Sequence, residues 1–485
     1  MNDARPADRR VCAARGGAWS RRGACAAGLL AALAGAVGCG AREARPVPVP
    51  APPPAPLVVT VVPAGPAPGA APTDVGVGLP DGARLLRLDV ATPGAAPVEL
   101  AAGLASAGEG SVNAEGTRLA FVGRAKAGGP AAVWTCAPDG SGRREVAPSP
   151  SDRGAPAWLP DGRLVFAGVV DGPAPVAAWG HAWALFVAAD DGSPATRITF
   201  GAGLEVDPAV LPDGRVVFVG WQPTDADAGA FALFTVHPDG SGVAAYHGGD
   251  GVGTPRRPRV AADGRVAFVT TAADGTTRAW ALDRRWPAGP ASEVTAARGA
   301  RVVTPRGGDG FLAVGEGGLG TIEGGGAPPT PVAAALPAGT AAWAAATLAP
   351  SPRPQGHLSF VDPKTSWGQL LGLDARFPRT AAAARVRVRR YDRAAPRVEG
   401  DVVVEAPLEA DGSFFVRVPP DAPLLVDVLD ATGAVVERSR TPIWVRPRET
   451  RGCVGCHDDG DVSPPNRRPM AVTRDAVAPR EEARR

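Results

Sequence analysis

The middle of the chain repeats a pattern of polar turns followed by short apolar runs. Four segments share it: SVNAEGTRLAFVG, PAWLPDGRLVFAG, PAVLPDGRVVFVG and PRVAADGRVAFVT, with turn glycines Gly116, Gly162, Gly214 and Gly264. Glycine in such a turn adopts positive φ and reverses the chain. Each following run, such as Leu164–Phe166, is therefore predicted to be a buried β-strand.

A second element alternates with the first. It reads VWTCAPDGSG, LFVAADDGSP and LFTVHPDGSG, and both elements recur about every 50 residues. Two hairpin signals per repeat predict four short strands. Such sheets have two apolar faces that only neighbouring sheets can cover, so the repeats are predicted to stack radially as propeller blades.

The repeat resembles that of TolB-like β-propellers, and the resemblance is clear over residues 105–275. Weaker units at Leu79–Gly82, Asp309–Ala313 and His357–Val361 extend the predicted propeller to residues 75–365, which gives about six blades, with seven also compatible. The repeated Asp-Gly, Trp and Phe positions are interpreted as turn and core residues. Because propellers serve as enzymes, binding platforms and scaffolds, this fold alone does not predict a function.

A third region, residues 380–448, alternates apolar and polar positions with the period of a β-strand. The expected strands are Arg385–Tyr391, Asp401–Glu405, Phe414–Val418 and Leu424–Leu429, separated by turn residues. This pattern predicts a small antiparallel β-sandwich. The predicted fold class is therefore all-β: a propeller, a sandwich and a short C-terminal segment.

The N-terminal region resembles an export signal, predicted over residues 1–38. Several arginines precede the apolar run Ala24–Val37, which is too short to span a bilayer as a helix. The run ends at Cys39-Gly40, where small residues before a cysteine resemble a bacterial lipoprotein signal, although Ala36 replaces the usual Leu. Cys39 is predicted to be lipidated, with cleavage without a lipid as the alternative. Residues 39–74, rich in Pro and Ala, are expected to form a linker.

Composition narrows the choice of function. The formal net charge is +2, which argues against nucleic-acid binding because such domains concentrate basic residues on one face. The 63 glycines and 53 prolines fall mostly in turns and the linker. The propeller region has no Ser/His/Asp grouping at a recognisable spacing. His181, His237 and His247 are expected at the surface or rim, with haem or metal ligation as the alternative, and Cys136 is expected to be a buried thiol.

The residues that indicate chemistry are Cys453, Cys456 and His457 in the motif C-V-G-C-H. Two thiols at this spacing, expected on one helical turn, can bond the two vinyl groups of a haem while the adjacent imidazole coordinates its iron. The motif predicts one covalent haem c in residues 449–475, followed by a disordered tail, 476–485. The alternatives are a disulfide or redox pair, and a zinc site, which would need further Cys or His ligands.

The second axial ligand of the predicted haem stays open. Met470 lies 13 residues after His457 and follows a Pro-rich stretch that could turn the chain back towards the haem. A Met/His haem has a raised potential that suits electron transfer. A histidine such as His357 and an open or water-ligated iron are the other two candidates.

A longer stretch carries a second resemblance. The sequences GDVVVEAPLEADGSFFVRVPPDAPLLVDVLDATGAVV, WVRPRE and CVGCH, behind a TolB-like propeller, resemble the middle region of the hydrazine synthase alpha subunit, over residues 105–470. The resemblance implies that Cys453, Cys456 and His457 bind haem. In the catalytic member of that family a Tyr four positions after the motif His binds the iron, whereas this sequence has Asp461. The resemblance therefore does not imply hydrazine synthesis.

These expectations converge on an exported, lipid-anchored c-type haem protein of the cell envelope, periplasmic or held at the outer membrane. Its propeller is expected to be an interaction platform, and its role electron transfer or binding of a redox partner, either a protein or a small redox molecule, rather than catalysis. One alternative is a non-redox envelope scaffold that binds protein or glycan through the propeller. Another is a haem oxidoreductase related to hydrazine synthase.

Overall fold

The computed structural model describes most of the chain after residue 54. The described ranges are 55–64, 79–92, 94–223, 229–248, 252–261, 263–272, 275–306, 310–315, 318–323, 328–332, 336–376, 382–393, 400–439, 441–453 and 467–479. These residues are almost entirely β-strands and turns, with three single-turn 3₁₀ helices: η1 (Ala177–Trp179), η2 (Thr295–Ala297) and η4 (Met470–Thr473). No helix within these ranges has the length and apolar sequence needed to cross a membrane.

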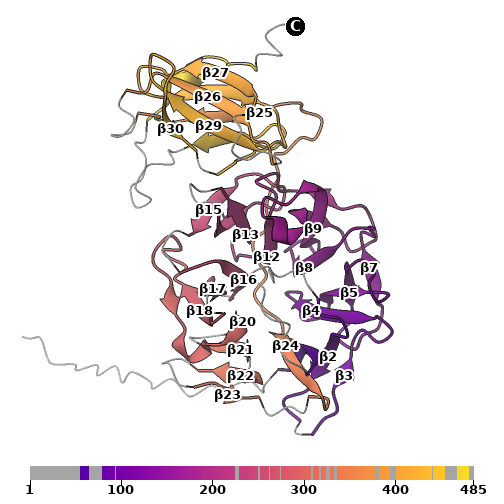
Figure 1. The fold of residues 1–485 in the computed structure, drawn as a ribbon. Coiled ribbons are helices and arrows are strands. Elements are labelled where there is room, and N and C mark those ends of the chain that lie inside the picture. Colours follow the sequence, from indigo (N-terminus) through magenta and orange to yellow (C-terminus); the bar gives the residue numbers. More distant parts are fainter. Residues whose placement is uncertain are drawn as a thin grey trace, which may run out of the picture. The chain divides into compact units, whose positions relative to one another are not determined.

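Six four-stranded antiparallel sheets form the blades of a β-propeller (Figure 1). From the inner to the outer strand, blade 2 contains β4 (Ser106–Val112), β5 (Leu119–Arg124), β6 (Ala132–Cys136) and β7 (Arg144–Val146); blade 3 contains β8 (Arg153–Trp158), β9 (Leu164–Pro173), β10 (His181–Ala188) and β11 (Thr196–Arg197); blade 4 contains β12 (Glu205–Val210), β13 (Val216–Gln222), β14 (Ala230–Val236) and β15 (Ala244–His247). Blade 5 contains β16 (Pro255–Val260), β17 (Val266–Thr271), β18 (Thr277–Leu282) and β19 (Ser292–Glu293), and blade 6 contains β20 (Ala300–Pro305), β21 (Phe311–Gly315), β22 (Gly318–Ile322) and β23 (Thr330–Pro331). The prediction of about six blades is confirmed.

Blade 1 closes the ring with strands from both ends of the propeller. Its inner strand β24 (Thr340–Thr347) pairs with β1 (Leu57–Pro63), which is followed outwards by β2 (Arg84–Leu88) and β3 (Val98–Glu99). The predicted linker, 39–74, was therefore too long, because residues 57–63 belong to a blade. The run Leu-Val-Val-Thr-Val-Val is rich in β-branched residues and buried on both faces, so it behaves as a core strand despite its Pro-rich surroundings.

The blade core follows the predicted pattern. The four phenylalanines of the second strands, Phe121, Phe166, Phe218 and Phe268, are among the largest fully buried side chains. The preceding turn glycines all have positive φ, as the Asp-Gly turns require; for example, φ is +85° at Gly162 and at Gly214. The apolar runs and turns were thus interpreted correctly.

Behind the propeller in sequence, two sheets form the predicted β-sandwich. One sheet contains β28 (Phe414–Val418), β25 (Gly368–Gly372) and β31 (Thr450–Cys453); the other contains β27 (Val402–Pro407), β26 (Arg385–Arg390), β29 (Leu424–Leu429) and β30 (Val435–Arg438). Apolar side chains of both sheets, such as Leu370, Val388 and Val416, share one core. The sandwich starts at β25 and not at residue 380 as predicted, because Gly368–Gly372 pairs along its whole length with β28.

Residues 349–367, which we call the strap, connect β24 to β25 across the propeller (Figure 1). The amide of Ser351 donates to the carbonyl of Ala114 in blade 2, and the amide of Gln355 donates to the carbonyl of Pro212 in blade 4, both at 2.8 Å. The predicted blade unit at His357–Val361 is wrong, since these residues form no strand and belong to the strap.

The sandwich contacts blades 3 and 4. The indole nitrogen of Trp444 donates to the carbonyl of Gly240 at 2.8 Å, and the Trp444 ring is buried in the core cluster formed by these blades. The hydroxyl of Thr441 and the side-chain oxygen of Gln222 lie 2.6 Å apart. These contacts hold the sheet that carries Cys453 at the propeller edge.

Candidate functional site

Cys453 is the last residue of β31 and the only member of the C-V-G-C-H motif within the described residues. It pairs in parallel with Gly372 of β25, and the amide of Leu373 donates to the Cys453 carbonyl at 3.1 Å. The Cys453 side chain is half-buried. The sequence interpretation placed both thiols on one helical turn, whereas the structure has extended chain up to Cys453; Cys456 and His457 lie outside the described residues.

The next described residues, 467–479, begin at the same edge of the sheet. Arg467 donates through Nη2 to Asp374 Oδ2 at 3.1 Å and to the carbonyl of Asp411 at 2.9 Å. Asp374 follows Gly372, the pairing partner of Cys453, by two residues. Both ends of segment 454–466 are thus anchored around the turn that follows β25.

Met470 lies at this anchored return. Its amide donates to Asp411 Oδ2 at 2.9 Å, and the next amide, of Ala471, donates to Ser413 Oγ at 3.0 Å. The Met470 side chain is 44% exposed, so η4 is fixed to the sandwich through its backbone while the thioether remains accessible. This position agrees with a chain that turns back towards the motif, but its role as an iron ligand stays a prediction.

The charge of the Asp411 carboxylate stabilises the position of the chain at Met470. Burial tends to raise the pKa of Asp411, but hydrogen bonds from Ser413 and the Met470 amide outweigh it and lower the pKa below its usual value. The Asp411 carboxylate therefore stays ionised and keeps accepting both bonds at neutral pH. In the sequence Asp411 is only one of the turn residues before the predicted strand Phe414–Val418, because its partners lie 56 to 59 positions away.

The strand that ends at Cys453 begins at the propeller. Glu449, just before β31, accepts a hydrogen bond from the amide of Gly242 at 2.9 Å and another from the amide of Arg446 at 2.7 Å. The Arg451 guanidinium donates to the carbonyl of Val243. Burial raises the pKa of Glu449. Sequence patterns do not reveal this junction, since the contacts of Glu449 with Gly242 and of Arg451 with Val243 join residues 207 and 208 positions apart.

His357, the alternative iron ligand, is engaged by the propeller. Its Nε2 lies 2.9 Å from Asp239 Oδ2, which also accepts from Ser359 Oγ at 2.7 Å, and its ring stacks on His237 with centroids 4.2 Å apart. Burial tends to raise the pKa of Asp239, but hydrogen bonds, first from Ser241 and then from Ser359 and His357, lower it to about 2. These contacts tie the strap to blade 4.

The other cysteines and histidines singled out in the sequence lie in different environments. Cys136 is fully buried, as expected, and burial raises the pKa of its thiol to about 11. His181 is exposed, but His247 is only 5% exposed, so its predicted surface position is wrong; its Nδ1 lies 3.1 Å from the carbonyl of Pro287. Cys39 lies outside the described residues. Across the described ranges, no group of three or more His, Cys, Asp or Glu side chains could hold a metal ion.

Comparisons with known proteins point to the same region. Residues 385–458 match the family described as the hydrazine synthase alpha subunit middle domain. The structure of hydrazine synthase from Kuenenia stuttgartiensis superposes with a TM-score of 0.76 at 17% identity, covering 87% of this chain and 72% of that chain. The chain therefore shares the fold of that protein. No curated protein sequence matches it.

Two TolB structures are also similar over part of the chain. TolB from Acinetobacter baumannii gives a TM-score of 0.41 at 15% identity, covering 56% of this chain and 62% of that chain. A putative TolB from Agrobacterium tumefaciens gives 0.36 at 20% identity, covering 49% and 87%.

Proposed function

We propose that the protein is an exported c-type haem protein that carries electrons or binds a redox partner. In this proposal the thiols of Cys453 and Cys456 attach the haem and His457 coordinates its iron. The observation that carries the proposal is the position of Cys453: it ends a paired strand, and Cys453 and Arg467, which flank segment 454–466, are both bonded around the turn that follows β25.

The donor set fits a haem. The motif offers two thiols that can bond the two vinyl groups of a haem and an imidazole that can coordinate its iron, and the return at Met470 offers an accessible thioether as a candidate second axial ligand. When bound, haem supplies a one-electron carrier whose potential depends on its axial ligands. The protein's part is to fix the segment ends through Asp374 and Asp411 and to join them to the propeller through Glu449.

The propeller fits the role of a docking platform. The sandwich already contacts it through Trp444 and Glu449. A redox partner that docked near blade 4 would lie close to the strand that leads into Cys453. We further propose that the mature chain starts at a lipidated Cys39 and resides in the cell envelope, attached to a membrane through the lipid.

A haem stain and a pyridine haemochrome spectrum test the attachment. The full-length gene is expressed in a bacterial host that has the c-type maturation system, and wild type is compared with Cys456→Ala and His457→Ala. We expect covalent haem in wild type, loss of covalent attachment or a shifted haemochrome band in Cys456→Ala, and an altered visible spectrum in His457→Ala. The matched control is Cys136→Ala, which removes a buried thiol outside the motif and should retain the haem.

The scaffold alternative gives a different result in the same experiment. A protein that matures without haem, with Cys453 and Cys456 joined as a disulfide, would overturn the proposal in favour of a non-redox envelope scaffold. An oxidoreductase with an open iron would show spectral changes when nitric oxide or ammonia is added to the reduced protein. Cys39→Ala separates the questions of location and haem, since it should release the protein from membranes but leave the haem attached.

A further inference from the structure

A pocket of about 420 Å³ opens between the propeller and the sandwich. Its propeller side is formed by the end of β9, the end of β11 and the segment after it, and its sandwich side by the residues after β26 and before β29. The lining residues include Arg197, Phe200, Tyr391, Arg393 and Pro423. The volume falls within the usual range for small-molecule sites and far exceeds the space of a single water molecule.

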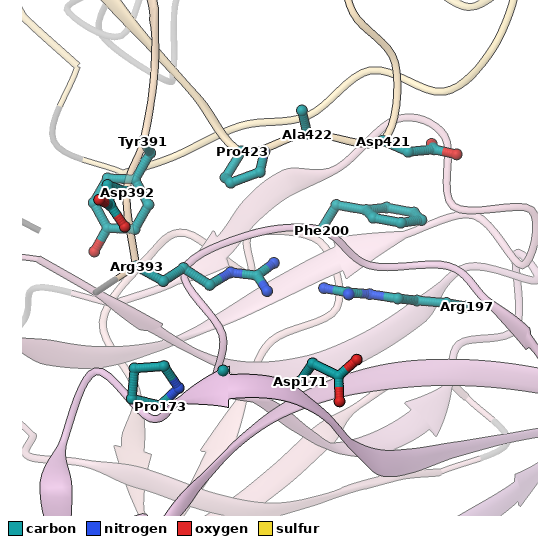
Figure 2. A pocket seen from close by; sticks show the side chains of 11 residues that line it. Asp171, Pro173, Arg197, Phe200, Tyr391, Asp392, Arg393, Asp421, Ala422 and Pro423 are labelled. Atoms are coloured by element: carbon teal, nitrogen blue, oxygen red, sulfur yellow. The ribbon is translucent and has the colours of Figure 1, made fainter. Parts of the chain in front are cut away.

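Two guanidinium groups converge in this pocket. Figure 2 shows Arg197 from the propeller and Arg393 from the sandwich pointing towards one another below the ring of Phe200. Arg393 Nε donates to the carbonyl of Gly201 at 3.1 Å, and Arg197 Nε donates to the carbonyl of Thr199 at 2.7 Å. Backbone carbonyls thus orient both groups without neutralising their charge.

The buried charges around the pair do not balance. Glu205 is 3% exposed and interacts electrostatically with both arginines, but it provides one negative charge for two positive charges. Asp421 is occupied by Arg446, with Nη1 and Oδ1 2.7 Å apart. One positive charge is therefore left without a buried counter-charge.

Donor atoms are also left over. Arg197 Nη2 and Arg446 Nε are both buried and have no hydrogen-bond partner within the described part of the chain. Both guanidiniums stack on Phe200, with Cζ to ring-centroid distances of 4.7 and 5.0 Å, so they are held in place. Burial lowers the pKa of Arg197 to about 10; Glu205 and Asp421 oppose this shift, whereas Arg393 and Arg446 add to it.

We propose that this pocket binds a small organic monocarboxylate whose carboxylate is held by Arg197 and Arg393. A planar carboxylate matches the donor geometry of guanidinium groups. The remaining volume and the apolar walls Pro173, Ala422 and Pro423 accommodate a short organic part. The exposed carboxylates of Asp171 and Asp392 at the rim disfavour a doubly charged anion such as phosphate.

The proposal is independent of the haem and links the two parts of the molecule. Arg197 is the last residue of β11 in blade 3 and Arg393 follows the sandwich strand β26, so one carboxylate bound to both would bridge propeller and sandwich. Ligand binding would then stabilise the contact that positions β31 and Cys453.

Isothermal titration calorimetry of the full-length protein tests the site with benzoate, at constant ionic strength. Benzamide, the neutral counterpart, and inorganic phosphate serve as comparison probes. We expect benzoate to bind, and benzamide and phosphate to bind at least tenfold more weakly. Arg393→Gln should weaken benzoate binding at least tenfold. The benzoate affinity of Arg393→Lys should lie between those of wild type and Arg393→Gln, because lysine keeps the charge but lacks the planar donor pair.

A matched control guards against general destabilisation. Arg143→Gln removes a guanidinium that likewise donates to a backbone carbonyl, that of Ala102, but lies in blade 2, and it should leave benzoate binding unchanged. If Arg393→Gln does not fold, the comparison of benzoate with benzamide and phosphate on wild type still decides. Absence of benzoate binding to wild type, equal binding of benzamide, stronger binding of phosphate, or an unchanged affinity in folded Arg393→Gln would each overturn the proposal.

Discussion

The propeller and the sandwich both contain Asp–Arg pairs, but they use them differently. In the propeller, Asp161 and Arg163 pair within one turn at 2.7 Å, with side chains 49% and 45% exposed. In the sandwich, Asp427 is fully buried and accepts from Arg389 at 2.7 and 3.1 Å and from Arg438 at 3.0 Å. Asp427 and its two arginines join strands β26, β29 and β30, whereas the turn pair joins residues two positions apart.

This difference shows how each region is specified. The Asp–Arg pair in the Asp-Gly turns of the propeller is local and recurs in three blades, so the loss of one copy affects one hairpin. The Asp427 contacts of the sandwich are long-range, and removing one partner leaves a buried charge without compensation. We therefore expect substitutions in the two regions to change the free energy of unfolding by different amounts, even where the residue types are the same.

The largest effect is expected at Asp427. Asp427→Asn leaves Arg389, whose side chain is 3% exposed, without its carboxylate, and should lower the free energy of unfolding by about 3–5 kcal/mol. Guanidinium-induced unfolding measures the change, and hydrogen exchange of the β29 amides locates it in the sandwich. A loss below about 1 kcal/mol would contradict the buried pair as the main constraint on this sheet.

The next effect separates two turn glycines that look identical in the sequence. A Cβ on Gly214 would lie 2.2 Å from the carbonyl oxygen of Gln355 in the strap, whereas a Cβ on Gly162 would meet no atom within 4 Å. Both have φ of +85°. Gly162→Ala should cost about 1 kcal/mol through backbone strain, and Gly214→Ala about 2–4 kcal/mol because the strap must also move.

Hydrogen exchange of the Gln355 amide distinguishes these two effects. This amide donates to the carbonyl of Pro212, so it should exchange faster in Gly214→Ala and at the wild-type rate in Gly162→Ala. Equal unfolding free energies and equal exchange rates in the two variants would mean that the strap does not rest on this turn.

A smaller effect is expected at Asp239, which holds the strap through His357 and Ser359. Its folded pKa of about 2 lies below its unfolded value of about 3.9, so the stabilisation is complete above about pH 4 and is lost as the pH falls from about 4 to about 2. Asp239→Asn should cost about 1–2 kcal/mol at pH 7, and the difference from wild type should shrink over that interval.

Unfolding curves recorded from pH 2 to pH 7 measure this dependence. Asp139→Asn is the matched control, because Asp139 occupies the corresponding turn of blade 2 and accepts from the Ser141 amide at 2.9 Å but from no strap residue. A pH-independent difference between wild type and Asp239→Asn would show that the carboxylate charge does not hold the strap.

The smallest effect is expected at the exposed turn pair. Arg163→Ala should change the free energy of unfolding by no more than about 0.5 kcal/mol, because an exposed ion pair gains little over its hydrated partners. Thermal unfolding at low and high salt checks this. A loss above about 1 kcal/mol would place this turn with the buried pair of the sandwich and remove the contrast between the regions.

The sequence predicts features that depend on neighbouring residues. The blade repeats, their positive-φ turns and the alternation of the sandwich strands are local signals, and the structure confirms them. Strand β1 was missed because Leu57–Val62 is embedded in Pro-rich sequence and its partner, β24, lies about 280 positions away. The strap was mistaken for a blade because His357–Val361 alternates like a strand although its polar side chains bind Asp239.

The candidate site shows the same limit. The motif at Cys453 is readable because its spacing carries the chemistry. Its anchoring through Asp374, Asp411 and Glu449 cannot be predicted from the sequence, since these residues contact partners that are distant in the chain. The pocket could not be predicted at all, because Arg197 and Arg393 belong to different parts of the fold and share no motif.

Mass spectrometry of the mature protein tests the proposed chemistry most directly. The protein is purified from a bacterial host with c-type haem maturation. The mass of the intact protein counts the haem groups, and the mass of the proteolytic peptide that contains Cys453 and Cys456 locates their attachment. We predict one haem per chain, bound covalently to this peptide through both thiols. An intact protein without added haem mass, whose peptide contains a disulfide or two unmodified thiols, would contradict the proposal.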